Sequence, residues 1–535
     1  MKYQLLNRQA SLLQDLEGVM DEADSFEEWQ ELATQYDAVS GGDQWRKTPA
    51  SQRYDHASIT RRLRRLRRLR RADDDRGLLF ALNEGIHGNM AGMGRANLYQ
   101  PAKCGTKHLI EDYIDEICAA LEHLAGEGGR AIPLVERFEF FQRASHCYGR
   151  SALMLSGGGT LGYFHFGVLK ALVEQQLCPV VISGASAGAF VAAVMGTRTD
   201  REFLALFEDN YLARAMTENR GKIKIGFGMD AQVDMPAIRR EMGRLIPDMT
   251  FLEAYEKTGR SINITISPAE PKQESRLLNH VASPNVTILS AVLASSALPG
   301  VFPPVQLEAK DDHGAVKPYL PKRRWIDGSF SQDLPAKRLA RLYGVNHFIV
   351  SQVMPGLGRE PSTRPGIYQI ISDAWVAATK KLVRGSLDAV QRYTRVGART
   401  GSVLNALNGL IDQQFTGDIN IFPGYGYSSL GKLLKVLTEE EMRELIKAGE
   451  RGTWPKIPII RTTTRIGRTI DKILHHYELE QTHWLKSSPN TEEYRSAASA
   501  PAKGRKRASS AAPSRSKKKP ATRDRRDPGE AVAAV

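Results

Sequence analysis

The sequence predicts a protein of the α/β class with helical flanks and a basic C-terminal tail. Three observations lead to this prediction. Between residues 153 and 194, two apolar runs are each followed by a glycine-rich turn and then by a helix-like run. Helical patterns dominate before residue 150 and after residue 350, and the composition becomes Ala/Ser/Pro/Lys/Arg-rich after Ser487. With 535 residues, of which 41% are hydrophobic, the chain is long enough for a large core and more than one structural unit.

The first glycine-rich turn, residues 157–162, lies between the apolar run 153–155 and a helix-like run at 163–172. Consecutive glycines expose backbone N–H groups that can bind an anion, either an oxyanion or a phosphate. A dinucleotide site would favour an acidic residue at the end of a second strand about 20 residues further on. That strand instead ends at a serine, and no Gly-Lys-Ser/Thr follows to complete a P-loop. The pattern therefore favours an oxyanion loop.

The second turn, Gly184-Ala185-Ser186-Ala187-Gly188, follows the apolar run 180–182 and precedes a helix-like run at 189–195. A serine in this frame is typical of a nucleophile elbow, with its hydroxyl exposed at the start of a helix. The serine needs a base. Asp327 is the favoured candidate, because Trp325-Ile326-Asp327-Gly328 indicates a strand that ends in a tight turn. An ordinary turn at Asp327, and a Ser-His-Asp arrangement that uses His347, remain alternatives.

Charge and cysteine content restrict the class of protein. The net charge is +14, but 12 basic residues and one acid between Arg495 and Arg526 account for +11, so the remainder is close to +3. The four cysteines form no C-x-x-C pair and suggest neither zinc nor disulfides. The first 24 residues show no secretory signal, so a cytoplasmic location is expected. The uncharged stretch 175–197 is expected to be a strand and a helix, because Pro179 and its glycines interrupt a membrane span.

The N-terminal region is expected to be helical, with Ser25 as an N-cap and a strongly periodic helix at 103–125. Residues 61–71 contain eight arginines with Leu63, Leu66 and Leu69 three apart. One interpretation is an interfacial helix that binds anionic lipid. The favoured interpretation is a solvated helix whose leucines pack on the domain and whose arginines meet acids such as those at 73–75. Nucleic-acid binding is disfavoured because no aromatic residues are interleaved.

Five segments together resemble the patatin-like phospholipase family: SGGGTLG at 156–162, FHFGVL at 164–169, GASAG at 184–188, ASSALPGVFPPV at 294–305 and DGS at 327–329. The resemblance implies a three-layer α/β/α core and a Ser-Asp dyad, with no metal or other cofactor. Carried over to this sequence, it makes Ser186 the nucleophile and Asp327 the base. Leu161 stands where many members have Arg or Lys. The expected oxyanion hole comprises Gly157, Gly158, Gly159 and Thr160, and the motif glycines are Gly162, Gly184, Gly188 and Gly328.

The flanks resemble the triacylglycerol-lipase branch of that family, which has an N-terminal helical domain, and the likeness covers roughly residues 20–475. The resemblance implies a serine acyl-ester hydrolase that acts on acylglycerol or phospholipid at a membrane or lipid-droplet surface. The alternative is a non-catalytic lipid-surface or scaffold protein. No oligomeric state is predicted. The expected domains are a helical N-terminal domain (1–150), a patatin-like catalytic domain (151–350), a C-terminal extension with helices at 367–395 and 438–447 (351–486) and a disordered basic tail (487–535).

Overall fold

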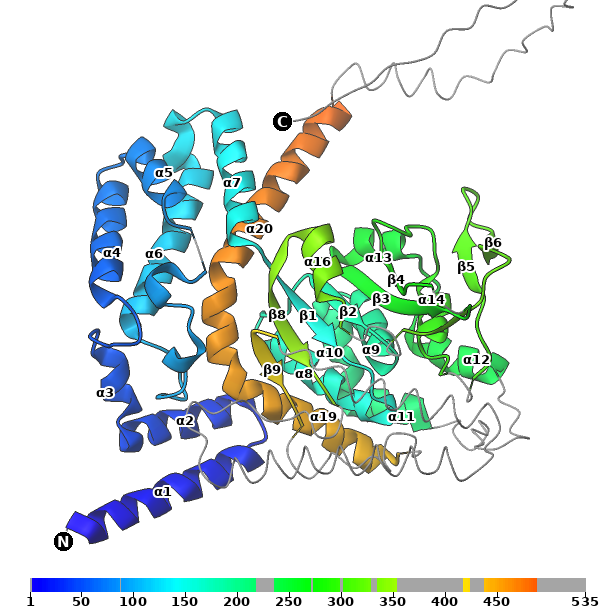
Figure 1. Ribbon diagram of the computed structural model, residues 1–535, viewed down its shortest axis with the longest axis horizontal. Helices are drawn as coiled ribbons and strands as arrows, with labels where there is room; N and C mark the ends of the chain where they lie inside the picture. The colour runs from blue at the N-terminus through cyan, green and yellow to red at the C-terminus, as the bar shows by residue number, and fades with distance from the viewer. Residues whose placement is uncertain are drawn as a thin grey trace, which may run out of the picture. The chain divides into compact units, whose positions relative to one another are not determined.

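The computed structural model describes residues 2–86, 88–217, 235–270, 273–298, 302–328, 334–353, 417–423 and 437–487 (Figure 1). The predicted helix at 367–395 and the predicted basic tail beyond 487 lie outside these ranges. The chain divides into the unit Met1–Tyr477 and the unit Glu478–Val535. The fold described below is that of the first unit.

A mainly parallel β-sheet lies at the centre of the α/β region. Its main path has the order β4-β3-β2-β1-β8-β9, and β7 joins it by pairing with β3. The strands β1, β2, β3, β8 and β9 run parallel to one another, whereas β4 and β7 both run antiparallel to β3. The strand bounds are β1 Arg150–Leu155, β2 Val181–Gly184, β3 Ser261–Pro268, β4 Arg276–Leu278, β7 Trp325–Asp327, β8 Val345–Ser351 and β9 Ile419–Ile421.

Helices cover both faces of the sheet. Successive side chains of a strand point to opposite faces, and apolar side chains occupy both faces, so each face needs a covering layer. On β1, Leu153 and Leu155 belong to one hydrophobic core, and Ala152 and Met154 belong to another. The first core contains residues of α8 (Tyr163–Glu174), α9 (Ala187–Gly196), α14 (Ile288–Ser295) and α19 (Glu439–Thr453). The second contains Ala336 and Leu339 of α16 (Ala336–Tyr343). The three-layer α/β/α arrangement predicted for the core is therefore confirmed.

The N-terminal region is helical, as predicted. Its residues 54–144 contribute to a separate hydrophobic core, whereas Met20, Phe26, Trp29 and Ala33 belong to the core of the α/β region. Ser25 caps its helix by accepting a hydrogen bond from the Glu28 N–H, and the periodic segment at 103–125 forms a helix from His108 to Ala125. The helices of this region are α1 Lys2–Glu22, α2 Phe26–Ser40, α3 Gly42–Lys47, α4 His56–Arg71, α5 Asp75–Asn83, α6 His108–Ala125 and α7 Leu134–Tyr148.

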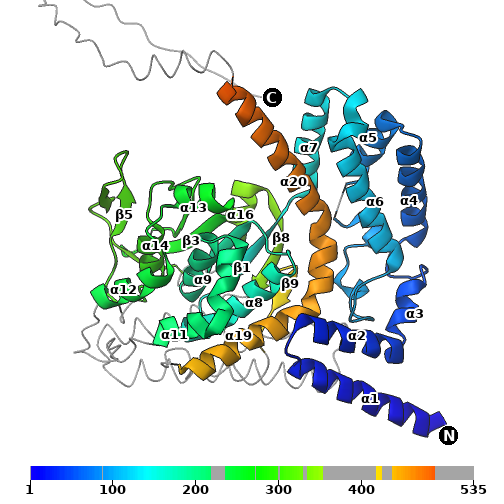
Figure 2. The same cartoon turned by 180° about the vertical axis from the view of Figure 1, so that it is seen from behind.

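The helix α20 (Ile457–Ser487) joins the two cores. Its first turn supplies Ile457 and Ile460 to the core of the α/β region, whereas Ile466 and Ile470 pack in the core of the helical region. In both ribbon views α20 runs between the two regions (Figures 1 and 2). The predicted C-terminal extension thus returns to the N-terminal helices, a long-range contact that no local pattern indicated.

The remaining elements surround the sheet. The stretch 175–197 is divided between β2 and α9, as expected. Among the described helices, none has both the length and the apolar content needed to cross a membrane. The other bounds are α10 Asp200–Leu204, α11 Tyr211–Thr217, α12 Met235–Leu245, α13 Phe251–Thr258 and the hairpin of β5 Leu307–Lys310 and β6 Val316–Tyr319.

Candidate active site

Ser186 occupies the sharp turn between β2 and α9, as the sequence predicted. Its backbone has φ 51° and ψ −120°, a conformation that is unfavourable for any residue with a Cβ atom. Such a conformation costs about 1–3 kcal/mol and persists only where the surroundings enforce it. Gly188 belongs to those surroundings, because a Cβ atom there would lie 2.3 Å from the Leu155 carbonyl oxygen. The turn therefore packs tightly on the end of β1 while Ser186 stays partly exposed.

The strand pairing places Asp327 at the same end of the sheet as Ser186. Gly184, the last residue of β2, pairs with Ile264 of β3, and Asp327, the last residue of β7, pairs with Ile266. The opposite edge of β3 is occupied by β4, which also pairs with Ile264 and Ile266. Consequently β2 and β7 share one edge of β3, and their C-terminal ends face each other across roughly 7 Å, two residues of β3.

The Thr265 carbonyl lies next to both strand ends and contacts residues from each side. The Ser295 hydroxyl donates to the Thr265 carbonyl oxygen at 2.8 Å and accepts from the Ser186 N–H at 2.9 Å. Gly328 passes over the same carbonyl, because a Cβ atom on Gly328 would lie 2.1 Å from that oxygen. Asp327 itself is buried, with 2% of its surface exposed. The fold thus fixes both predicted catalytic residues relative to one short segment of β3.

The first glycine turn connects β1 to α8, and residues 159–162 form a short 3-10 helix. Gly162 packs against the elbow, since a Cβ atom there would lie 2.6 Å from the Ala187 Cβ. Gly158 is buried and Gly159 has φ 55°. Within the described part of the chain, the N–H groups of these two residues donate no hydrogen bond. Gly158 is buried, where a donor without an acceptor is costly, and Gly159 is exposed beside it, so both amides are available to bind an oxyanion.

A buried histidine supports this turn from behind. The His165 Nε2 lies 3.0 Å from the Ser156 carbonyl oxygen, and its Nδ1 lies 2.7 Å from the Ser351 Oγ. Because a carbonyl can only accept, Nε2 carries the proton and Nδ1 accepts from the Ser351 hydroxyl. Complete burial lowers the pKa of His165 to about 4, so the ring is neutral. Both ring nitrogens are engaged, which makes His165 a positioning residue.

His347 lies at the other end of the strands. Its Nδ1 is 3.0 Å from the Ser151 Oγ, beside the first residues of β1, whereas the elbow lies beyond Leu155. Four residues of strand separate these positions, roughly 13 Å. Burial lowers the pKa of the His347 imidazole, and the nearby Asp418 opposes this effect. The geometry disfavours the alternative in which His347 is the base.

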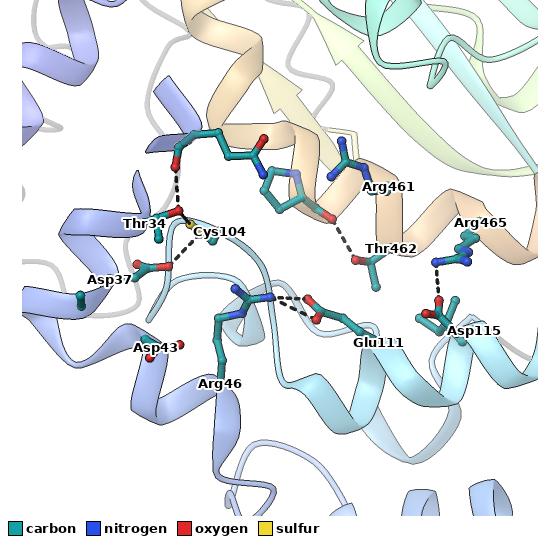
Figure 3. Close-up of a pocket in the computed structure, with 14 residues that line it drawn as sticks. Thr34, Asp37, Asp43, Arg46, Cys104, Glu111, Asp115, Arg461, Thr462 and Arg465 are labelled. Carbon is teal, nitrogen blue, oxygen red and sulfur yellow. Dashed lines mark hydrogen bonds and ion pairs between the residues drawn. The ribbon is translucent and has the colours of Figure 1, made fainter. Parts of the chain in front are cut away.

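A cavity of about 510 Å³ lies in the N-terminal region, between α2, α3, α6 and α20 (Figure 3). None of the predicted site residues lines it. Its arginines have partners: the Arg46 Nη2 lies 3.1 Å from both Glu111 carboxylate oxygens, and Arg465 pairs with Asp115. Arg461 donates to the Gln175 Oε1 at 2.8 Å. This cavity is separate from the candidate active site.

Two residues that position the site were not identified from the sequence. Ser295 bridges Ser186 and Thr265 across 109 and 30 residues, and His165 joins Ser156 to Ser351. Both lie inside the quoted family segments, which was the only available signal. His165 precedes Ser186 in the chain, whereas the histidine of an ordinary Ser-His-Asp hydrolase would follow the serine.

Comparison with known proteins places the chain in a family. Residues 153–340 match the family described as patatin-like phospholipase, and residues 7–146 match a domain of unknown function, DUF3336. The chain is 35% identical over 458 residues to triacylglycerol lipase ptl3 of Schizosaccharomyces pombe, with 83% of this chain and 93% of that protein covered. It is 34% identical over 482 residues to triacylglycerol lipase 4 of Saccharomyces cerevisiae, with 84% and 52% covered.

A patatin-like phospholipase domain-containing protein of Cryptococcus neoformans is 33% identical over 474 residues, with 84% of this chain covered. The chain spans about half the length of that relative, 53%. The two family matches cover the N-terminal region and the α/β core, and the Schizosaccharomyces protein matches across both of them. The chain therefore belongs to the patatin-like phospholipase family.

Proposed function

We propose that this chain is a carboxylic ester hydrolase that cleaves acyl esters of acylglycerols or phospholipids through a Ser186–Asp327 dyad. Asp327 takes the proton as the Ser186 Oγ attacks the ester carbonyl carbon. The carbonyl oxygen then becomes an oxyanion, which the amides of Gly158 and Gly159 stabilise, with those of Gly157 and Thr160 completing the predicted hole.

The second half of the reaction reverses these roles. Asp327 returns its proton to the departing alkoxide as the carbon–oxygen bond breaks, leaving an acyl-enzyme on Ser186. Water then attacks the acyl carbonyl, Asp327 accepts the water proton, and the fatty acid leaves as the Ser186 hydroxyl is restored. Every step uses groups of this chain and water.

One observation supports the proposal most strongly: the strained Ser186 faces the end of the short strand that terminates at Asp327. A scaffold protein would gain nothing from a backbone strain of about 1–3 kcal/mol at a serine. The relatives named triacylglycerol lipase support a lipid ester as the substrate. Because such esters are insoluble in water, we propose a lipid surface as the place of action.

The experiment compares the wild type with Ser186→Ala and Asp327→Asn on a soluble short-chain ester, on triacylglycerol emulsions and on phospholipid vesicles at matched acyl concentration. We expect both variants to lose at least three orders of magnitude in rate on every substrate that the wild type cleaves. Retained hydrolysis in Ser186→Ala, with melting temperatures unchanged, would rule out the dyad.

A further inference from the structure

The helix α4 has two different faces. Ile59, Leu63 and Leu66 are buried, with 0–5% of their surface exposed, and α4 packs on α6. Four exposed arginines lie on the opposite face: Arg61, Arg64, Arg68 and Arg71, called the arginine stripe below. Their spacing of three or four residues aligns them along the helix, over roughly 15 Å.

The other arginines of α4 have partners within the domain. Arg65 pairs with Glu84 at 2.8 Å, Arg70 pairs with Glu116 at 2.7 Å, and Arg67 approaches the same glutamate at 3.4 Å. Arg62 donates to the Tyr113 hydroxyl at 3.0 Å. The prediction that the leucines pack and that the arginines meet acids is confirmed, but the acids at 73–75 are not the partners. Glu84, which caps the C-terminus of α5, and Glu116 of α6 take that role.

The acids at 74 and 75 are committed elsewhere. Asp74 caps α5 by accepting the Gly77 N–H, and the Asp75 Oδ1 lies 2.8 Å from the His123 Nε2. Within the described residues, the side chains of Arg64, Arg68 and Arg71 form neither an ion pair nor a hydrogen bond. Arg61 donates only to the Ser58 hydroxyl, at 2.8 Å. The arginine stripe therefore presents four guanidinium groups that form no ion pair within the described residues, although Arg61 also interacts electrostatically with the Asp55 carboxylate.

The arginines of the cavity in the same region differ from those of the stripe. There Arg46 and Arg465 each pair with a carboxylate (Figure 3). Arg461 donates to the Gln175 amide oxygen. Two of the three arginines that line this cavity thus pair with carboxylates of the domain. The arginine stripe faces away from them, which points to an anionic partner from outside the chain.

We infer that the arginine stripe docks the protein on a lipid surface that carries anionic phosphate headgroups. Guanidinium groups bind phosphate through paired N–H donors, and a row of them matches a flat array of headgroups. A nucleic acid is the less favoured partner, since the stripe has no interleaved aromatic residue for stacking. This inference rests on the proposed action at a lipid surface and adds where on the protein that surface binds.

The test uses the full chain with Ser186→Ala, so that vesicles stay intact. Vesicles of phosphatidylcholine alone, or with 30% phosphatidylserine, are sedimented with this protein, with a variant in which the four stripe arginines become glutamine, and with one in which they become lysine. We expect the glutamine variant to partition about a hundredfold less onto the anionic vesicles at 0.1 M salt. The lysine variant should keep most of the binding, because it keeps the charge.

Unchanged partitioning of the glutamine variant would overturn the inference. The inference would also be overturned if the glutamine variant lost binding to a DNA or RNA duplex but kept its binding to anionic vesicles. Hydrolysis of a soluble short-chain ester, measured with Ser186 intact, should be the same with and without the stripe. A wild type that cleaves none of the soluble ester, triacylglycerol and phospholipid substrates refutes the dyad and leaves the vesicle result standing, so the two proposals fail separately.

Discussion

The two strand-to-helix turns of the α/β core solve the same geometric problem with different residues. In the turn after β1, the positive φ of 55° falls on Gly159, where it costs little. In the turn after β2, a similar φ of 51° falls on Ser186, which has a Cβ atom. In the proposed mechanism the first turn contributes only backbone amides, so a glycine can occupy the position with positive φ. The second turn contributes the Ser186 side chain, so the backbone strain falls on a residue with a Cβ atom.

The supports of the two turns differ accordingly. Behind the first turn stands the neutral ring of His165, held between Ser156 and Ser351. Behind the second stands the Ser295 hydroxyl, which ties the Ser186 N–H to the Thr265 carbonyl. Each support is buried and polar, so removing either leaves backbone groups without partners. The comparison predicts different consequences for catalysis and for stability.

The largest effect is expected at Asp327, which neither turn contains but which the second requires. Asp327→Asn keeps the shape of the side chain and removes the base, so kcat should fall by about three orders of magnitude. Asp311→Asn, the same change in the β5–β6 hairpin, is the matched control and should leave kcat unchanged. Equal kcat for the two variants would show that Asp327 is not the base.

At the first turn, the prediction concerns pH. The folded-state pKa of His165, about 4, lies below its ordinary value of 6.5, so the unfolded chain binds the proton more readily. The wild type should therefore lose up to about 3 kcal/mol of stability as the pH falls from 6.5 to 4. His165→Asn should remove that part of the slope in denaturant titrations, while His313→Asn, at an exposed position, should keep it. A slope shared by all three proteins would contradict the assigned burial.

At the second turn, Ser295→Ala should lower kcat by about 10–100-fold with little change in KM, because a displaced nucleophile reacts poorly while the lipid contacts remain. Its neighbour gives a matched control: the Ser296 hydroxyl makes no hydrogen bond within the described residues, so Ser296→Ala should keep the wild-type kcat. A parallel loss in both variants would indicate a general packing defect.

The smallest effect tests the strain directly. Ser186→Gly and Ser186→Ala should both be inactive, but the glycine variant should be more stable by about 1 kcal/mol, because glycine tolerates the positive φ. The same preference for glycine is expected at the first turn, where Gly159→Ala should destabilise the protein by a similar amount. Thermal unfolding measures both differences. Equal melting temperatures for the two Ser186 variants would mean that the turn stores no strain.

The sequence predicts both turns well because their signals are local. An apolar run, a glycine frame and a helix-like run follow one another within a few residues at 153–172 and at 180–195. Their packing partners are not local. The position of β7, beyond the end of β2, depends on its pairing with β3. The acids that pair with Arg65 and Arg70 come from outside α4. Predictions from neighbouring residues therefore named the wrong acids and missed Ser295.

The most direct measurement is covalent labelling with a fluorophosphonate, followed by identification of the modified peptide. The probe needs an activated serine beside an oxyanion hole, which is the arrangement assigned to the two turns. The dyad predicts one labelled residue, Ser186, with labelling abolished in Ser186→Ala and slowed by orders of magnitude in Asp327→Asn. Labelling at another serine, or at an undiminished rate in Asp327→Asn, would contradict it.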